Sequence, residues 1–485
     1  MRSDEYAQLD GLALAGLIRS GQVSRSEVMA AAQAAAEDLN PRLNFLVGKI
    51  EPHRSDDRPQ AAFSGLPLLV KDIGLALAGV RQEMGSRLAS GHSPNEDSEH
   101  ARRLLSAGFV IFGRTATPEL GSAFTTESRA SGPTRNPWDM SRSPGGSSGG
   151  AAVAVASGVV PIAHAGDSAG SIRIPAHCCG VFGLKPTRGR NPVGPQQGEV
   201  NSGLTAVHVL TRSVRDSAAV LDSTAGPDPG CGYFAPPPPR PYLESVSRQP
   251  GPLRIGFSAE SPLAGRISPQ IRDSVLAAAR LCEDLGHHVE AATIGFDPDE
   301  FVGDVETVWC SNMAFLAGLL EASTGRSAGP DTVEGGTLAM IRRGRAIGAE
   351  ALLGALSGLN RFARSWAAQT AEYDIFLTGS FADVAPPLGA IVNDREVGDV
   401  NGLIRELLGC APFTVQFNVT GQPAASIPLH MSSEGLPIAP QLVGRFAEEH
   451  VLLALCAQLE AEAPWRLRHP PVSAFGSPPA PAAAA

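Results

Sequence analysis

Short apolar runs alternate with segments of helical spacing along most of this 485-residue chain. Runs of this length, bounded by turn residues, indicate buried strands, and the segments between them are long enough to be helices. Such alternation is typical of an α/β fold with a mixed, mostly parallel sheet. The apolar runs are 66–70, 109–112, 159–164, 253–257 and 375–377, and the helical segments include 97–107, 213–224 and 268–285.

Composition narrows the class of protein further. The chain has 53 glycines and 40 prolines, and this many turn-forming residues disfavours an all-helical bundle. Hydrophobic residues make up 43% of the chain, enough for a large core, and the formal net charge is −10. An acidic chain offers no overall basic surface to nucleic acid or anionic lipid, so we expect neither nucleic acid nor a membrane as a partner.

One large domain is expected over 61–469, because the signals for linkers are only local. An N-terminal helical segment, 1–60, precedes this domain and is expected to pack on its core. Within that segment, Ser24 followed by Glu27 is a capping-box pattern that marks the start of a helix.

Three further segments stand out by composition. Residues 226–242 are rich in proline and predict a surface loop. Residues from about 300 to 372 have helical spacing and predict a cap-like region that covers the sheet or a pocket. The tail, 470–485, consists largely of proline and alanine, and its low complexity predicts disorder.

Cysteine usage and the first residues bear on the compartment. The seven cysteines, at 178, 179, 231, 282, 310, 410 and 456, form no C-x-x-C pair and indicate reduced thiols. The chain begins with Asp4 and Glu5 where a signal peptide has basic residues, and no apolar window is long enough to span a membrane. A cytoplasmic protein is therefore expected.

Candidate nucleophiles are concentrated in two glycine- and serine-rich loops, 144–150 and 166–171, joined by a stretch of small residues. Glycine on both sides of a serine allows a backbone to approach a ligand closely. A phosphate-binding loop is disfavoured, because no lysine follows the glycines and no apolar run precedes the first loop.

The second loop also fits another template. GDSAG at 166–170 matches the G-x-S-x-G nucleophile elbow of esterases, with Ser168 as the nucleophile after an apolar run. An elbow turns directly into a helix, whereas the β-branched residues and Pro175 in SIRIP disfavour a helix at that point. GSSGG around Ser148 fits the same template but lacks a strand before it. An esterase that uses Ser168 stays as an alternative.

The whole region resembles the amidase signature family of serine hydrolases. The resemblance rests on GSIRIPA and GLKPT after the second loop, and on further blocks in the family's order from about residue 10 to 465. Within the family, the chain is most similar to 6-aminohexanoate-cyclic-dimer hydrolases. The resemblance implies a twisted mixed sheet with helices on both faces. The further blocks are GLPLLVKDI (65–73), GFVIFGRTATPELG (108–121), TRNPWD (134–139), NVTGQPAASIP and GLPIAPQLVG.

The family's catalytic triad carries over onto three residues of this chain: Ser171 as nucleophile, Ser147 as bridging serine and Lys71 as base. The resemblance also implies a cis peptide between Gly146 and Ser147. The remaining candidate site residues fall into three groups. The oxyanion hole is expected from backbone N–H groups of Ser168, Ala169, Gly170 and Ser171, support from Ser148, Asp167 and Arg173, and the pocket from Ser122 and Cys310.

These assignments are chemically reasonable, because a serine hydroxyl attacks an amide only if a base takes its proton. Histidine is the usual base, but no histidine stands in a recognisable relation to the loops, and His164 within an apolar run is expected to be a core residue. For Lys71 to serve, its pKa has to fall from about 10.4 to near neutrality, and burial supplies such a shift. Asp72 points to the opposite face of the strand and should not oppose it.

The predicted reaction is hydrolysis of a carboxamide through an acyl-enzyme, on aliphatic, aryl or cyclic amides. No cofactor is expected, and no metal, because no His/Cys/Asp cluster has ligand spacing. The partner is a small-molecule amide, and the resemblance allows a homodimer. A glutamyl-tRNA amidotransferase A-type subunit, which passes ammonia on and needs a companion subunit, is the second alternative.

Overall fold

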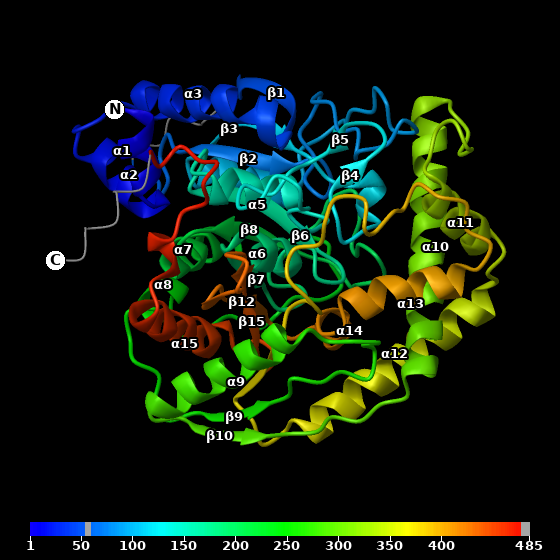
Figure 1. Ribbon diagram of the computed structural model, residues 1–485. Coiled ribbons are helices and arrows are strands. Elements are labelled where there is room, and N and C mark those ends of the chain that lie inside the picture. The colour runs from blue at the N-terminus through cyan, green and yellow to red at the C-terminus, as the bar shows by residue number, and fades with distance from the viewer. Residues whose placement is uncertain (54–59, 477–485) are drawn as a thin grey trace.

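The structure is a computed structural model that describes residues 1–53 and 60–476 (Figure 1). The described residues contain an eleven-stranded sheet with helices around it. The fifteen helices in this part of the chain are α1 (Ser3–Gln8), α2 (Gly11–Arg19), α3 (Arg25–Leu43), α4 (Glu99–Ser106), α5 (Gly149–Ala156), α6 (Arg173–Cys179), α7 (Val214–Thr224), α8 (Tyr242–Ser245), α9 (Pro269–Asp284), α10 (Pro298–Thr324), α11 (Gly335–Arg345), α12 (Ala349–Gln369), α13 (Val400–Cys410), α14 (Val415–Thr420) and α15 (Glu449–Glu462), with 3₁₀ turns η1 (Glu119–Gly121) and η2 (Trp465–Leu467).

The large sheet mixes parallel and antiparallel neighbours. Its strands, in spatial order, are β1 (Leu46–His53), β3 (Val110–Thr115), β2 (Pro67–Lys71), β6 (Ile162–Asp167), β8 (Ala206–Thr211), β7 (Phe182–Lys185), β12 (Ala424–Ser426), β15 (Pro440–Gly444), β11 (Ile375–Gly379), β9 (Arg254–Phe257) and β10 (His288–Ala291). Two small two-stranded sheets pair β4 (Glu127–Ser128) with β5 (Gly132–Pro133), and β13 (His430–Met431) with β14 (Pro437–Ile438).

The pairing confirms the predicted α/β class with a mixed sheet. β3, β2 and β6 are parallel to one another, and so are β11, β9 and β10. The strands between these two groups, and the edge strand β1, pair antiparallel. The predicted parallel character therefore holds in two parts of the sheet. Parallel strands end at the same edge, so the carboxyl ends of β2 and β6 lie side by side.

Burial explains why the predicted apolar runs became strands. All five residues of β2 are buried, because helices cover the sheet and leave no face of this strand to water. α3 and α5 pack near β2, while α9 and α15 pack near β15 (Figure 1). Ser24 caps the start of α3, and its side chain accepts from the backbone N–H of Glu27, so the predicted capping box is present.

The N-terminal segment differs from the prediction in one element. It contains the helices α1, α2 and α3, but residues 46–53 form β1, the edge strand of the large sheet, antiparallel to β3. The expected N-terminal helical segment thus contains three helices and also a strand, and its residues 54–59 lie outside the described residues. A short apolar run next to a helix is hard to assign from sequence, and pairing with β3 decides in favour of a strand.

The predicted cap-like region is helical, with α10, α11 and α12 stacked at one side of the molecule (Figure 1). The Pro-rich segment 226–242 has no regular structure until α8 begins at Tyr242, and most of its residues are exposed. Among the described residues, no helix is long and apolar enough to cross a membrane.

The predicted disorder from residue 470 is wrong for the part of the tail that the structure describes, 470–476. Val472 and Phe475 are each only 7% exposed, and the backbone N–H of Ala474 donates to the carbonyl of Ser157 at 2.8 Å. The ring of Phe475 stacks on His469, with centroids 3.9 Å apart. Two apolar side chains inside a low-complexity sequence thus dock on the core. Residues 477–485 of the predicted tail lie outside the described residues.

Docking of this segment predicts that Phe475→Ala lowers the free energy of unfolding by about 3 kcal/mol, because a buried aromatic side chain leaves a cavity. Chemical denaturation of the variant and the wild type measures this difference. Leu467→Ala is the control: this side chain is 61% exposed, and its loss should change stability by less than about 0.5 kcal/mol. Equal effects of the two substitutions would contradict the docking.

Candidate active site

Two neighbouring parallel strands bring the predicted triad together. Lys71 is the last residue of β2, and β6 ends at Asp167, four residues before Ser171. The first glycine-serine loop leads into α5 and carries Ser147. Lys71, Ser147 and Ser171 all line one cavity of about 1090 Å³. The structure therefore places the three residues around a common space, as the resemblance implied.

Lys71 is buried, with 2% of its surface exposed, and its Nζ lies 2.7 Å from the Oγ of Ser147. A longer contact of 3.4 Å joins Nζ to the carbonyl of Gly166. Burial lowers the pKa of Lys71 from 10.5 to about 7, against a smaller opposing effect of the charge of Asp167. At neutral pH much of this amine is uncharged and able to accept a proton.

Ser147 follows a tightly enclosed glycine. The peptide between Gly146 and Ser147 is cis, as the resemblance implied. A Cβ on Gly146 would lie 2.4 Å from the carbonyl oxygen of Thr125, so only glycine fits at this position. The loop is thus packed from behind while Ser147 faces Lys71.

Ser171 belongs to the second loop, which hydrogen bonds hold against the first. The backbone N–H of Ser148 donates to the carbonyl of Ser171 at 3.3 Å, and the Ser148 hydroxyl donates to the carbonyl of Gly166 at 3.2 Å. Ser171 is 6% exposed, and among the described residues its hydroxyl has no hydrogen-bond partner. The expected supporting position of Ser148 matches these contacts.

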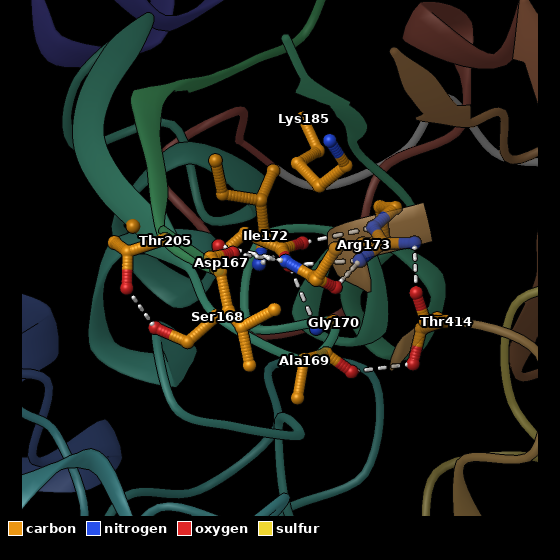
Figure 2. A network of polar contacts seen from close by, with 12 residues as sticks. Asp167, Ser168, Ala169, Gly170, Ile172, Arg173, Lys185, Thr205 and Thr414 are labelled. Atoms are coloured by element: carbon orange, nitrogen blue, oxygen red, sulfur yellow. Dashed lines mark hydrogen bonds and ion pairs between the residues drawn. The ribbon is translucent and has the colours of Figure 1, made fainter. Parts of the chain in front are cut away.

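A fully buried ion pair, Asp167–Arg173, lies beside the second loop (Figure 2). Arg173 donates to Asp167 from Nε at 2.9 Å and from Nη2 at 2.8 Å. Its remaining donors reach the carbonyl of Thr414 at 2.9 Å and the side-chain oxygens of Gln441 and Asn418 at 2.7 and 2.6 Å. Burial alone would raise the pKa of Asp167, but the Arg173 charge and these hydrogen bonds hold it well below its usual range.

The carboxylate of Asp167 also shapes the expected oxyanion loop, with one correction. It accepts the backbone N–H of Gly170 at 2.7 Å and that of Ile172 at 3.1 Å (Figure 2). The N–H of Gly170 is therefore not open to a substrate, contrary to its expected place in the oxyanion hole. The N–H groups of Ser168, Ala169 and Ser171 have no acceptor among the described residues.

Gly170 has a second reason to be glycine. Its φ is +129°, and a Cβ there would lie 2.5 Å from the Oγ1 of Thr414. That hydroxyl in turn donates to the carbonyl of Ala169 at 2.6 Å, a contact that Figure 2 shows. The carbonyl of Ala169 thus points toward Thr414.

The sequence argument against a nucleophile elbow at Ser168 was wrong in one step. The helix α6 begins at Arg173, and Pro175 lies in its first turn, where a helix does not need the proline's missing N–H. The contacts of Ser168 still give no elbow chemistry. Its Oγ lies 2.6 Å from Thr205 Oγ1 and 2.9 Å from Asn201 Nδ2.

The nearest histidine in sequence, His164, is fully buried on β6, and neither of its ring nitrogens has a partner in the described part of the chain. Its ring packs 5.6 Å from that of His100, measured between centroids. Burial holds the pKa of His164 well below its usual range. His164 is a core residue, as predicted, and not a base for either serine loop.

The two pocket candidates have different outcomes. Ser122 lines the cavity, and its hydroxyl donates to the carbonyl of Glu119 at 2.7 Å. Cys310 on α10 does not line the cavity; it is fully buried, and the next helix, α11, packs against its backbone. Its neighbours Trp309 and Asn312 line the cavity instead. Sequence reasoning chose the helix correctly but not its face, which depends on how α10 packs.

Most of the remaining cavity wall is apolar. Met84, Leu120 and Phe124 contribute from the loops, and Met313, Leu316 and Met340 from the helices α10 and α11. Within residues 1–53 and 60–476, no three His, Cys, Asp or Glu side chains gather as a metal ion would require.

Comparison with known proteins shows which family the chain belongs to. The family model described as Amidase matches residues 27–453. The chain belongs to the amidase family. It is therefore a hydrolase that acts on carbon–nitrogen bonds, and the resemblance seen in its sequence motifs is confirmed.

Members of this family resemble the chain over nearly its whole length. The 6-aminohexanoate-cyclic-dimer hydrolase of Paenarthrobacter ureafaciens is 36% identical over 477 residues, covering 95% of this chain and 96% of the relative. A solved structure of 6-aminohexanoate cyclic dimer hydrolase with substrate has a TM-score of 0.89 at 35% identity, covering 96% and 99%. A bacterial aryl acylamidase shares the fold, with a TM-score of 0.85 at 22% identity over 97% and 99%.

The buried pair predicts a large cost for removing one partner. Arg173→Met leaves Asp167 charged, buried and without its main donor, which should lower the free energy of unfolding by about 3–5 kcal/mol. Urea denaturation measures the change. The double variant Asp167→Leu/Arg173→Met removes both charges and should recover part of this loss. A single variant as stable as the wild type would contradict the account of the pair.

Proposed function

We propose that this amidase hydrolyses a carboxamide through an acyl-enzyme on Ser171, with Ser147 relaying the proton to Lys71. One observation carries the proposal: the 2.7 Å contact between a buried lysine amine and Ser147, in a cavity that Ser171 also lines. A lysine whose pKa is lowered to about 7 is matched to proton transfer at neutral pH.

In the acylation step, uncharged Lys71 takes the proton of the Ser147 hydroxyl as Ser147 takes that of Ser171. The Oγ of Ser171 forms a bond to the amide carbon, and the carbonyl becomes an oxyanion. When the carbon–nitrogen bond breaks, the proton returns through Ser147 to the leaving amine. Water then attacks the ester carbon and gives its proton through Ser147 to Lys71. When the ester C–O bond breaks, that proton returns through Ser147 to the Oγ of Ser171, and the acid is released.

Backbone N–H groups of the second loop are the proposed donors to the oxyanion. Ala169 and Ser171 have open N–H groups, whereas that of Gly170 is bound to Asp167. Removing one such donor typically costs on the order of a hundredfold in rate, so loop position matters. We assign Asp167 and Arg173 the task of holding that loop rigid.

The cavity favours a neutral, largely apolar amide. Met84, Phe124 and Met313 are typical of a wall that takes methylene chains or rings. Two of the relatives named above are hydrolases of the 6-aminohexanoate cyclic dimer. That compound and related aliphatic, aryl and cyclic amides are therefore the proposed substrate class.

Covalent labelling tests the nucleophile. A fluorophosphonate should add one adduct to the wild type, and fragment sequencing should place it on Ser171. Lys71→Met should slow labelling by at least about a hundredfold, because the serine loses its base. Ser168→Ala should still be labelled at Ser171. An adduct on Ser168 would instead support the esterase alternative, and absence of turnover by the purified chain would support an amidotransferase subunit.

The lowered pKa of Lys71 predicts the pH profile. Since only the uncharged amine acts as a base, log kcat/KM should rise with pH up to about 7 and level off above it. Steady-state kinetics on an aryl amide measures the profile.

Lys185 provides the control, because burial lowers its pKa to about 7 as well, while its Nζ donates to the carbonyl of Pro186 outside the cavity wall. Lys185→Met should keep the same rise with pH. Lys71 would be contradicted as the base if Lys185→Met lost the rise of kcat/KM with pH. A wild-type kcat/KM that falls as pH rises through 7 would contradict it too.

A further inference from the structure

One face of α10 forms a wall of the cavity. Trp309, Asn312, Met313 and Leu316 follow one another at helical spacing and all line the space that Ser171 lines. Met313 and Leu316 are apolar, and the polar side chains farther along α10 are already bonded, Ser323 to His92 and Thr324 to the carbonyl of Leu320. The open hydrogen-bonding groups of this helix face therefore belong to Trp309 and Asn312.

Asn312 lines the cavity with its amide donors already in use and with no donor to its amide oxygen among the described residues. Its Nδ2 donates to the carbonyl of Val308 at 2.8 Å and to the Oγ of Ser202 at 2.9 Å. A backbone carbonyl only accepts, so the contact with Val308 fixes which end of the amide is nitrogen. No described residue donates to Oδ1, and the side chain is partly exposed, so this oxygen is open to a ligand.

Trp309 supplies the complementary group. It precedes Asn312 by three residues, which places both side chains on the same face of the helix. Its ring is held edge-on against Phe124, with centroids 6.4 Å apart and planes at 66°. An indole N–H only donates, and that of Trp309 has no acceptor among the described residues.

Another polar side chain of the wall is already satisfied. The Ser122 hydroxyl donates to the carbonyl of Glu119 and accepts from Asn393 Nδ2 at 3.3 Å. An open acceptor beside an open donor in an apolar wall matches the N–H and C=O of a secondary amide.

We propose that Asn312 and Trp309 bind a second amide of the substrate, one that is not cleaved, with Asn312 accepting its N–H and Trp309 donating to its carbonyl. The scissile amide cannot be this group, because its carbon has to reach Ser171 and its oxygen the loop at 168–171. A cavity of about 1090 Å³ has room for both. The assignment rests on the proposed function and narrows it to diamides and amide-bearing acyl chains.

Three kinds of p-nitroanilide test the assignment, because the same anilide bond is cleaved in each. The ω-acetamidoacyl probes, with three to six methylenes, carry the second amide. Their N-methylacetamido counterparts lack only its N–H. Nonanoyl p-nitroanilide lacks the second amide and normalises every variant for general loss of activity.

In the wild type, kcat/KM should favour the best acetamido probe over its N-methyl counterpart by about tenfold, the usual worth of one hydrogen bond to a partly exposed site. Asn312→Leu should reduce this ratio to about one. Trp309→Phe should lower kcat/KM on the acetamido probe, relative to nonanoyl anilide, by about threefold to tenfold, because the ring stays and the donor is lost.

Ser311→Ala is the matched control, since its hydroxyl donates to the carbonyl of Thr307 and the residue does not line the cavity. This variant should keep the wild-type ratio. A wild type without preference for any acetamido probe, or a preference that survives in Asn312→Leu, would overturn the assignment.

Failure of the proposed function looks different: no anilide is cleaved, or Ser171→Ala cleaves as fast as the wild type. In that case calorimetry on Ser171→Ala measures binding of the same probe pairs. A preference for the N–H probe that Asn312→Leu abolishes then still supports the subsite, and equal binding of both probes overturns it.

Discussion

The desolvation of one amine organises this active site. Lys71 sits at the end of a fully buried strand, and the cost of keeping an ammonium there lowers its pKa to about 7. Asp167, at the end of the neighbouring parallel strand, opposes that effect with its negative charge. Arg173 offsets the carboxylate through two hydrogen bonds while both remain buried. The same ion pair that holds the second serine loop thus limits how far Asp167 keeps Lys71 protonated.

Much of this arrangement was predictable from the sequence, because it depends on local signals. Apolar runs placed β2 and β6 with their carboxyl ends near Lys71 and Asp167, and the capping box at Ser24 marked the start of α3. The family resemblance then assigned roles that spacing alone left open, and the structure put Ser147 within 2.7 Å of the Lys71 amine. Strand ends and loops are set by short stretches of chain, which a sequence displays directly.

The features that sequence reasoning missed depend on tertiary packing. Phe475 docks because a partner surface near Gly158 exists, and no local pattern in a Pro- and Ala-rich tail reports that surface. The N–H of Gly170 donates to Asp167 because the loop curls over that carboxylate. Cys310 faces the core while Trp309 faces the cavity, since a rotation of one residue around α10 separates the two. Which face is which follows from contacts far away in the chain.

The proton relay lies at the sheet and the proposed binding wall on the helices α10 and α11, and one hydrogen-bonded segment connects the two. Buried Glu119 accepts the backbone N–H of Glu334, just before α11, and the hydroxyl of Ser86. Burial raises its pKa to about 7, and among the described residues hydrogen-bond donors hold this carboxyl, with no paired cation. Two residues on, Gly121 lies against the Ser147 hydroxyl, close enough that a Cβ there would be 3.5 Å from Oγ. Because the helical layer and the bridging serine meet through this short segment, the cavity wall and the proton relay keep a fixed relative position, as a substrate held at two points requires.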